Sequence, residues 1–230
     1  MVDFHSHILP QIDDGSKSVK ESLDMLCMLR EQGVSLVAAT PHFDANATSV
    51  HRFVEKRAIA YDSLAAQMED TLPRILLGAE VQFYPGISRL EGLEKLCVEG
   101  TRVLLLEMPF SRWTTSVVQE VLSISNTLGL TVVLAHIERY LTWQRKGVVE
   151  ALLNNGIYMQ VNASFFFERR TRRRALKMLA RREVHLLGSD CHGVRVRPPR
   201  MDEAIKVIRK SLGDEPLEMI FGCATELLSV

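Results

Sequence analysis

This chain of 230 residues lacks several features, and each absence excludes a class of protein. No apolar run approaches the ~18 residues that a membrane-spanning helix needs, so we expect no insertion into a membrane. Neither sign of charge is in excess, because 28 Lys and Arg balance 28 Asp and Glu. A protein with zero net charge has no general attraction for nucleic acid or for an anionic membrane surface, and we expect neither partner.

Cysteine is scarce and scattered. Cys27, Cys97, Cys191 and Cys223 form no Cys-x-x-Cys pair and no zinc-finger spacing. Free thiols in a reducing compartment are therefore the simplest interpretation. The N-terminal segment also has no basic stretch followed by an apolar stretch, as a secretory signal would have. We expect a cytoplasmic protein.

Apolar runs rich in β-branched residues alternate with helical patterns along the whole chain. The predicted strands cover residues 2–5, 34–40, 75–83, 102–108, 130–136, 157–162 and 184–190. The predicted helices cover residues 18–32, 50–68, 90–98, 115–128, 148–155, 172–182, 201–212 and 217–221. Several of the strands are apolar on both faces, which is typical of a parallel sheet buried between two layers.

Seven such strand–helix units predict a single α/β domain over residues 1–230. This number of units favours a closed or nearly closed barrel of the TIM type, (β/α)7, over an open sheet. In such barrels the reactive groups collect at the carboxyl ends of the strands. No linker, repeat or low-complexity segment interrupts the pattern.

Imidazole and carboxylate groups occur at these predicted strand ends. His5 and His7 are two positions apart on an extended strand, so both side chains point to the same face. One such residue at one strand end is usually structural, but the repetition at six strand ends predicts a polynuclear metal centre. The nine candidate metal ligands are His5, His7, Asp14, His42, Glu80, Glu107, His136, Asp190 and His192.

Four of these candidates are carboxylates, and their mutual repulsion requires cations. Two unit charges ~4 Å apart cost roughly 4 kcal/mol at an effective dielectric constant of 20, and several such pairs would exceed the stability of an ordinary domain. Two divalent ions would balance the four negative charges, and a third would leave a positive field that attracts a phosphate dianion. Manganese, iron, zinc or cobalt suits this ligand set, and magnesium also stays open.

Two aspartates precede Gly15, and the sequence does not separate their roles by itself. Turn chemistry alone would explain both Asp13 and Asp14. We favour Asp14, the residue next to the glycine, as the ligand. We expect Asp3 to hydrogen-bond a ligand histidine and to orient it.

Arginines follow two of the candidate ligands. Arg139 lies about one turn past His136, and Arg197 follows His192. Because a guanidinium group can grip two phosphate oxygens at once, we predict that both arginines bind a substrate phosphate. Arg195 is the less favoured alternative to Arg197. The structural alternative is a pair of surface arginines bound to nearby acidic residues, Glu138 or Asp202.

A strongly basic segment follows the sixth predicted strand. It contains Arg169, Arg170, Arg172, Arg173, Arg174, Arg181 and Arg182. A solvated helix face is the ordinary explanation, and the alternative is a rim of the barrel mouth that attracts an acidic or multiply phosphorylated peptide. The neighbouring Phe165, Phe166 and Phe167 either are buried under a loop or line a slot for an aromatic ring.

These motifs resemble those of the PHP (polymerase and histidinol phosphatase) superfamily, and most closely its bacterial tyrosine-protein phosphatase branch of the CpsB/CapC/YwqE type. The resemblance is carried by residues 3–8, 13–15, 78–80, 135–140, 189–192 and 197–199. The His-Ile-Glu-Arg-Tyr stretch at 136–140 and the Arg-Pro-Pro stretch at 197–199 are specific to this branch. Together the motifs span nearly the whole chain.

The resemblance implies a distorted TIM-like (β/α)7 barrel of the PHP type that holds up to three metal ions, often manganese. It implies hydrolysis of phosphotyrosine on the phosphorylated tail of a bacterial tyrosine kinase that regulates capsule or exopolysaccharide biosynthesis. A homo-oligomer is compatible with it. The segment after the sixth strand is shorter than in family members.

The resemblance also implies how the nine ligands are shared. One ion would be bound by His5, His7, Glu80 and Asp190, a second by Glu80, Glu107 and His136, and a third by Asp14, His42 and His192. Asp14, His42, Arg139 and Arg197 are the residues expected to take part in catalysis.

We expect a metal-activated water to attack phosphorus in line with the leaving oxygen, while the arginines neutralise the other oxygens. The phenol of tyrosine has a pKa near 10, so its phenolate leaves more readily than an alkoxide and needs a strong general acid less.

Three alternatives stay open. Cys191 and Arg197 have the Cys-x5-Arg spacing of cysteine-dependent phosphatases, although the glycine-rich loop of that class is missing. A metal-dependent enzyme could instead act on a small phosphomonoester such as histidinol phosphate, or on a nucleic-acid phosphodiester, which the neutral charge disfavours. The third alternative is a non-catalytic metal-bound scaffold for the kinase.

Overall fold

The computed structural model describes residues 1–145 and 147–228, so three positions of the predicted 1–230 domain lie outside the described residues. The strands are β1 (Val2–Ser6), β2 (Leu36–Ala39), β3 (His42–Phe43), β4 (Arg74–Leu77), β5 (Glu80–Gln82), β6 (Val103–Glu107), β7 (Thr131–Leu134), β8 (Tyr158–Asn162) and β9 (Leu186–Gly188). The α-helices are α1 (Val19–Glu31), α2 (Val50–Ala65), α3 (Thr115–Leu128), α4 (Val148–Asn154), α5 (Ser164–Phe167), α6 (Arg172–Ala180), α7 (Met201–Leu212) and α8 (Glu215–Leu228). Three short 3₁₀ helices join them: η1 (Ile87–Arg89), η2 (Leu93–Leu96) and η3 (Ile137–Arg139).

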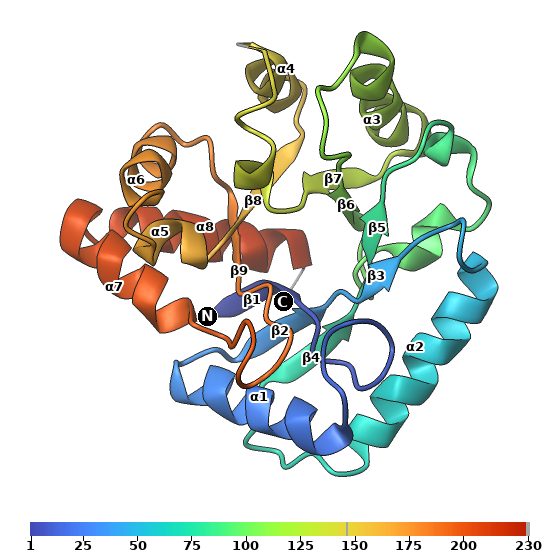
Figure 1. Ribbon diagram of the computed structural model, residues 1–230, viewed down its shortest axis with the longest axis vertical. Helices are drawn as coiled ribbons and strands as arrows, with labels where there is room; N and C mark the ends of the chain where they lie inside the picture. The colour runs from blue at the N-terminus through green and yellow to red at the C-terminus, as the bar shows by residue number, and fades with distance from the viewer. Residues whose placement is uncertain (146, 229–230) are drawn as a thin grey trace.

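The strands form a ring of parallel pairs with the helices outside it (Figure 1). One sheet has the order β1-β2-β4 and the other the order β3-β5-β6-β7-β8-β9, and a parallel bridge from Ser6 to Cys191 connects β1 to the segment after β9. In sequence, β2 and β3 are the halves of one interrupted strand, and so are β4 and β5. The interrupted ring therefore has seven strand positions, and the expected distorted (β/α)7 barrel is confirmed.

The two interruptions correct the predicted strand bounds. The strand predicted at 75–83 is divided at Gly78–Ala79, and the strand predicted at 34–40 resumes after Pro41 as β3, which was not predicted. Proline has no N–H group for a ladder, so a break at Pro41 follows from its chemistry. After the breaks, His42 of β3 stands in register with Glu80 of β5. The interruptions thus bring two candidate ligands side by side.

Helix ends follow local capping chemistry. The side chain of Ser18 accepts a hydrogen bond from the N–H of Glu21, and that of Thr114 accepts one from the N–H of Val117. Gly129 ends α3 with a φ of 64°, a left-handed conformation that glycine adopts without strain. Helices α3 and α7 have the predicted bounds. The segment predicted as a helix at 90–98 contains only the 3₁₀ helix η2, α5 was not predicted, and α8 is longer than predicted.

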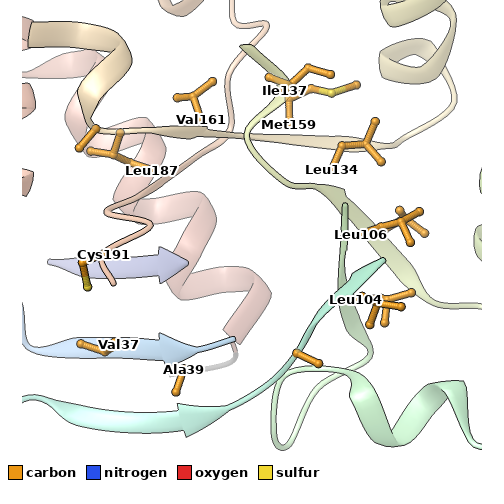
Figure 2. Close-up of a cluster of buried hydrophobic side chains, with 14 of the residues drawn as sticks. Val37, Ala39, Leu104, Leu106, Leu134, Ile137, Met159, Val161, Leu187 and Cys191 are labelled. Atoms are coloured by element: carbon orange, nitrogen blue, oxygen red, sulfur yellow. The ribbon is translucent and has the colours of Figure 1, made fainter. Parts of the chain in front are cut away.

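Two apolar clusters fill the barrel and its shell. Figure 2 shows part of the larger one, in which Leu106, Leu134 and Met159 come from neighbouring strands and are paired in register. The smaller cluster draws on strands all around the ring and on α8: Val2, Phe4, Leu36, Leu76, Val103, Leu105, Val133, Leu186, Ala224 and Leu228. A cluster with members from so many strands lies at the centre of the ring, so α8 covers one end of the barrel and leaves the other end open.

Across the described ranges, the search for a helix long and apolar enough to cross a bilayer found none.

Candidate metal centre

All nine predicted ligands lie at the carboxyl end of the barrel strands. His5 is in β1 and His7 follows it, while His42 and Glu80 begin β3 and β5. Glu107 is the last residue of β6. The others are in the loops that follow strands: Asp14, His136, Asp190 and His192. The fold therefore brings together side chains that are far apart in the sequence.

The centre of the group is one carboxylate oxygen. Oε2 of Glu80 lies 3.2 Å from Nε2 of His5, 3.3 Å from Nε2 of His7 and 3.0 Å from Nδ1 of His42. The two Nε2 atoms of His5 and His7 are 3.1 Å apart. Oδ1 of Asp190 lies 3.7 and 3.5 Å from these same two nitrogens. Such a cage has the donor types of a transition-metal site.

Further ligands extend this cage on two sides. Nε2 of His136 lies 2.7 Å from Oε1 of Glu80 and 3.6 Å from Oε1 of Glu107. On the open side, Oδ1 of Asp14 lies 3.5 Å from Nε2 of His42 and 3.5 Å from Nε2 of His192.

Three groups of donor atoms are each compact enough to hold an ion. They are His7, Asp14, His42 and His192; His5, His7 and Asp190; and His42, Glu80 and Glu107. His42 and His7 each belong to two groups, so the geometry shares ligands more widely than the three sets implied by the family resemblance.

The histidine rings are oriented from outside the centre. Nδ1 of His5 is 3.2 Å from Oε1 of Gln160, and Nδ1 of His7 is 2.7 Å from Oδ2 of Asp13. An Nδ1–H group that donates to such a partner leaves the Nε2 lone pair free to bind a cation. Nδ1 of His192 has a similar partner, the backbone carbonyl oxygen of Asp190 at 2.9 Å.

The donor set fits a divalent ion. Oε2 of Glu80 is buried and accepts no hydrogen bond within the described part of the chain. A buried carboxylate oxygen without hydrogen-bond partners is costly. A cation bound to this oxygen would remove that cost.

The structure separates the roles of the two neighbouring aspartates. Asp13 is nearly buried, and its carboxylate accepts hydrogen bonds from Nδ1 of His7 (2.7 Å), the N–H of His42 (2.9 Å) and the N–H of Gly15 (2.9 Å). The side chain of Asp14 is 67% exposed and directs one oxygen at two imidazoles. Asp13 thus contacts the ring of His7 and the loop backbone, whereas the Asp14 carboxylate faces the imidazoles of His42 and His192.

Charge interactions tie His7 to Asp13. Burial lowers the pKa of His7, but the hydrogen bonds and charges of Asp13 and Glu80 outweigh it and raise the pKa to about 10. Burial likewise opposes ionisation of Asp13, yet the contact with His7 and the backbone donors lower its pKa to about 2. Without a cation this is an ion pair, so metal binding must displace a proton from His7.

Asp3 hydrogen-bonds His5, as expected, and the contact is made to the backbone of that residue. Asp3 is buried, which raises its pKa to about 6 against the hydrogen bonds that it accepts. These come from the N–H (2.7 Å) and hydroxyl (2.6 Å) of Ser189 and, at 3.4 Å, from the backbone N–H of His5. Asp3 therefore fixes the backbone of β1 and the loop after β9, and Gln160 orients the ring of His5. An amide inside the apolar strand 157–162 was the available signal.

Both predicted phosphate arginines lie at the edge of the centre. Nη2 of Arg139 and Nη2 of Arg197 contact Oδ2 of Asp190, which also accepts a hydrogen bond of 2.7 Å from Nδ2 of Asn162. Nη1 of Arg197 lies 3.0 Å from Nε2 of His192. Within residues 1–145 and 147–228, neither guanidinium forms an ion pair with Glu138 or Asp202, and the exposed Arg195 does not line the cavity described next.

A cavity of about 500 Å³ opens beside these arginines. Its walls include Arg139, Arg197, Asn162, Phe165 and Thr171. Backbone strain is concentrated nearby, because His136, Asp190 and Arg197 have positive φ values of 32°, 52° and 52°. Residues other than glycine seldom adopt this conformation, and it recurs at functional sites.

Cys191 is not placed for the cysteine mechanism. Its side chain is buried in the larger apolar cluster, where Figure 2 shows it beside β1. Burial raises the pKa of this thiol, so the thiolate that such a mechanism needs is disfavoured.

Tyr140 joins the centre to an aromatic group that the sequence did not reveal. Its hydroxyl oxygen lies 3.1 Å from Nδ1 of His136 and accepts a hydrogen bond of 3.1 Å from the N–H of Met108. Its ring packs against those of Phe110 and Trp113, with centroids 5.1 and 5.4 Å away.

Comparisons with known proteins agree with this geometry. A family model described as "Capsular polysaccharide synthesis, CpsB/CapC" matches residues 1–228. The tyrosine-protein phosphatase CpsB of Streptococcus pneumoniae is 34% identical over 240 residues, covering 96% of this chain and 95% of that protein. CpsB of Streptococcus agalactiae serotype III (strain NEM316) is 30% identical over 232 residues, with coverages of 96% and 95%.

A solved structure gives a similar fold. It comes from "Crystal structures of YwqE from Bacillus subtilis and CpsB from Streptococcus pneumoniae, unique metal-dependent tyrosine phosphatases". It superimposes with a TM-score of 0.84 at 24% identity and covers 100% of this chain and 94% of that one. At this identity, the match shows the shared fold.

Proposed function

Because the chain belongs to the CpsB/CapC capsular polysaccharide synthesis family, we propose that it is a metal-dependent protein-tyrosine phosphatase that regulates capsule or exopolysaccharide biosynthesis. One observation carries the proposal. A buried carboxylate oxygen of Glu80 lies within 3.3 Å of three imidazole nitrogens, at a barrel mouth that also presents two arginines.

We propose up to three ions, manganese before iron, zinc, cobalt or magnesium. The residues that would hold them are His5, His7, Asp14, His42, Glu80, Glu107, His136, Asp190 and His192. When bound, divalent ions at such a site act as Lewis acids and lower the pKa of water toward neutrality. The mixture of imidazole and carboxylate donors supports this set of metals.

Arg139 and Arg197 are assigned to the substrate phosphate. Their side chains are 34% and 40% exposed, and each already contacts the outer oxygen of Asp190. Each planar guanidinium group can therefore donate to phosphate oxygens at the edge of the centre without a large movement. Their positive charge neutralises the equatorial oxygens of phosphorus, which is how such side chains accelerate phosphoryl transfer.

We propose that Asp14 and His42 take part in catalysis on the solvent-exposed side of the metal centre. Their side chains are 67% and 38% exposed, far more than the other histidines of the centre. We assign Oδ1 of Asp14 to accept a hydrogen bond from the attacking water and so to orient it toward phosphorus. The leaving phenolate needs little assistance, because the pKa of a phenol is near 10.

The proposed substrate is the phosphorylated tail of a bacterial tyrosine kinase in the cytoplasm. The basic segment that begins at Arg169 supports the proposal of an acidic peptide substrate, because Thr171 in this segment lines the same cavity as Arg139. Arg169, Arg170, Arg172, Arg173 and Arg174 are largely solvent-accessible around it. Four free thiols are consistent with a reducing compartment.

The decisive experiment combines metal analysis with a phosphatase assay. The protein is stripped with a chelator, reconstituted with each metal separately, and assayed on a phosphotyrosyl peptide, on histidinol phosphate and on single-stranded DNA. We expect turnover of the peptide only with metal. Preference for histidinol phosphate, or full activity after chelation with loss on iodoacetamide treatment, would refute the proposal.

Variants identify the residues involved. Replacing both His5 and His7 with alanine should abolish metal retention and turnover. His51→Ala is the matched control, because His51 is a histidine of α2 with a 78% exposed side chain. Wild-type rates in the double variant would refute the assignment of catalysis to this centre.

A further inference from the structure

Large exposed aromatic side chains gather on one side of the metal centre. Among the described residues, the large hydrophobic side chains that stand out as exposed are Ile59 (69%), Phe110 (49%), Trp143 (44%) and Val196 (74%). The two aromatic ones are neighbours, with ring centroids 6.3 Å apart and planes at 76°. Single exposed apolar residues are common on proteins, but an exposed edge-to-face aromatic pair marks a contact surface.

This pair borders the reacting centre. The ring of Phe110 lies 6.3 Å from that of His136, with an angle of 23° between their planes. Nε2 of His136 in turn faces Glu80 and Glu107. In an aryl phosphate ester, a single oxygen joins the ring to phosphorus. The aryl ring of a phosphate ester bound at the centre is therefore within reach of Phe110.

The loop that carries Phe110 is held in a fixed conformation. Nε1 of Trp113, a buried residue, donates a hydrogen bond of 3.1 Å to the carbonyl oxygen of Pro109. Gln144 accepts from the N–H of Trp113 and donates to the carbonyl oxygen of Ser111, both at 3.0 Å. A surface that is already ordered costs little conformational entropy when a ligand binds.

The other aromatic segment near the mouth, Phe165–Phe167, is less exposed than Phe110 and Trp143. Phe165 and Phe166 are buried, and the guanidinium carbon of Arg200 lies 4.3 Å from the ring centroid of Phe167. Burial therefore describes Phe165 and Phe166, while Phe165 and Phe167 also line the cavity beside Arg139 and Arg197. The exposed pair is the better surface for a substrate ring.

We propose that Phe110 and Trp143 contact the phenyl ring of the substrate and so select aryl over alkyl phosphate esters. This inference rests on the proposed phosphatase function and names the side chains that determine its specificity. Loss of one apolar contact in a binding site changes discrimination roughly tenfold or more.

Binding of two phosphonates tests the proposal without turnover. Phenylphosphonate and methylphosphonate share the anionic group and differ in the ring, and neither has a P–O ester bond to hydrolyse. By calorimetry on the manganese-loaded protein, we expect wild type to prefer phenylphosphonate. Phe110→Ala and Trp143→Ala should each weaken phenylphosphonate binding roughly tenfold and leave methylphosphonate unchanged, while Phe110→Tyr retains the preference.

The control is Ile59→Ala, which removes a more exposed apolar side chain from α2 and should change neither affinity. Metal content is measured for every variant. If Phe110→Ala loses metal through its contact with His136, Trp143→Ala decides the question, because its ring pairs with Phe110.

Equal wild-type affinities for the two phosphonates, or equal losses of both in the variants, would overturn the inference. A preference for phenylphosphonate in a protein that hydrolyses no phosphotyrosyl peptide would instead refute the proposed function and support the aromatic contact.

Discussion

The two neighbouring aspartates give the sharpest prediction, because their substitution should affect different properties. Asp13→Ala leaves three donors without their carboxylate: Nδ1 of His7 and the N–H groups of His42 and Gly15. An unsatisfied buried donor costs about 1–3 kcal/mol. Solvent can enter the space left by the side chain, so we expect the free energy of unfolding to fall by roughly 3–5 kcal/mol in total.

Asp14→Ala should behave in the opposite way. Its carboxylate is 67% exposed and contacts only imidazole nitrogens at 3.5 Å, so the chelated protein should change in stability by less than about 0.5 kcal/mol. It should, however, bind one metal ion fewer and lose most of its phosphatase activity. The measurements are urea unfolding in excess chelator, metal content by mass spectrometry, and turnover of a phosphotyrosyl peptide.

The pH dependence of the chelated protein provides a second readout for Asp13. The pKa of His7 is raised from 6.5 to about 10, so its contribution to stability is complete below pH 6.5 and is lost as the pH rises toward 10. The pKa of Asp13 is lowered from 3.8 to about 2, so its contribution is lost as the pH falls from 3.8 toward 2. Asp13→Asn should flatten both slopes.

The assignment fails if Asp14→Ala retains the full metal complement and wild-type activity. It also fails if Asp13→Ala unfolds at the wild-type urea concentration. If Asp13→Ala lost metal and activity while Asp14→Ala lost stability, Asp13 would be the ligand and Asp14 a loop residue.

The remaining predictions each concern a single residue. Cys191→Ala should keep turnover within about twofold, and the wild type should resist iodoacetamide, since the Cys191 thiol is buried; a large loss of turnover in the variant, or strong inactivation of the wild type, would revive the cysteine mechanism. Gly188→Ala should cost roughly 2–3 kcal/mol and weaken metal binding, because the added Cβ would lie 2.5 Å from Cβ of His5. Gly222→Ala, in open space on α8, should instead add about 0.5–1 kcal/mol in the same urea titration. Calorimetry in buffers of different ionisation enthalpy should detect proton release from His7 on metal binding at pH 7, and none would contradict its raised pKa.

Local chemistry explains which parts of the fold were predictable. Helix α3 begins after the capping Thr114 and ends at Gly129, and both signals are present in the sequence itself. The alternation of apolar strands and helices likewise determined the barrel class. The division of the strand at 75–83 was not predicted, because Gly78–Ala79 is apolar enough to continue a strand pattern and only its pairing reveals the break.

The candidate ligands could also be recognised in the sequence, whereas the residues that support them could not. Histidines and carboxylates at strand ends are recognisable, since apolar runs position them. The choice between Asp13 and Asp14 depends on how the loop folds back, which brings Gly15 so close that a Cβ there would lie 2.3 Å from the carbonyl oxygen of His7. Phe110 and Trp143 follow no periodic pattern, and only tertiary packing makes them neighbours.

The amide of Gln160 has a wider consequence than the orientation of one ring. Its single Oε1 lies 3.2 Å from Nδ1 of His5 and accepts a hydrogen bond of 2.7 Å from the N–H of His136, while its Nε2 donates to Asn162. Asn162 in turn donates a hydrogen bond to Oδ2 of Asp190, the oxygen that also contacts Arg139 and Arg197.

One uninterrupted chain of polar contacts therefore runs from the imidazoles proposed to bind cations to the guanidinium groups proposed to bind phosphate. Since thermodynamic linkage is reciprocal, any tightening of phosphate affinity by cation loading must be matched by an equal tightening of cation affinity by phosphate. The two halves of the catalytic apparatus would thus assemble as a unit, with substrate itself helping to retain the ions.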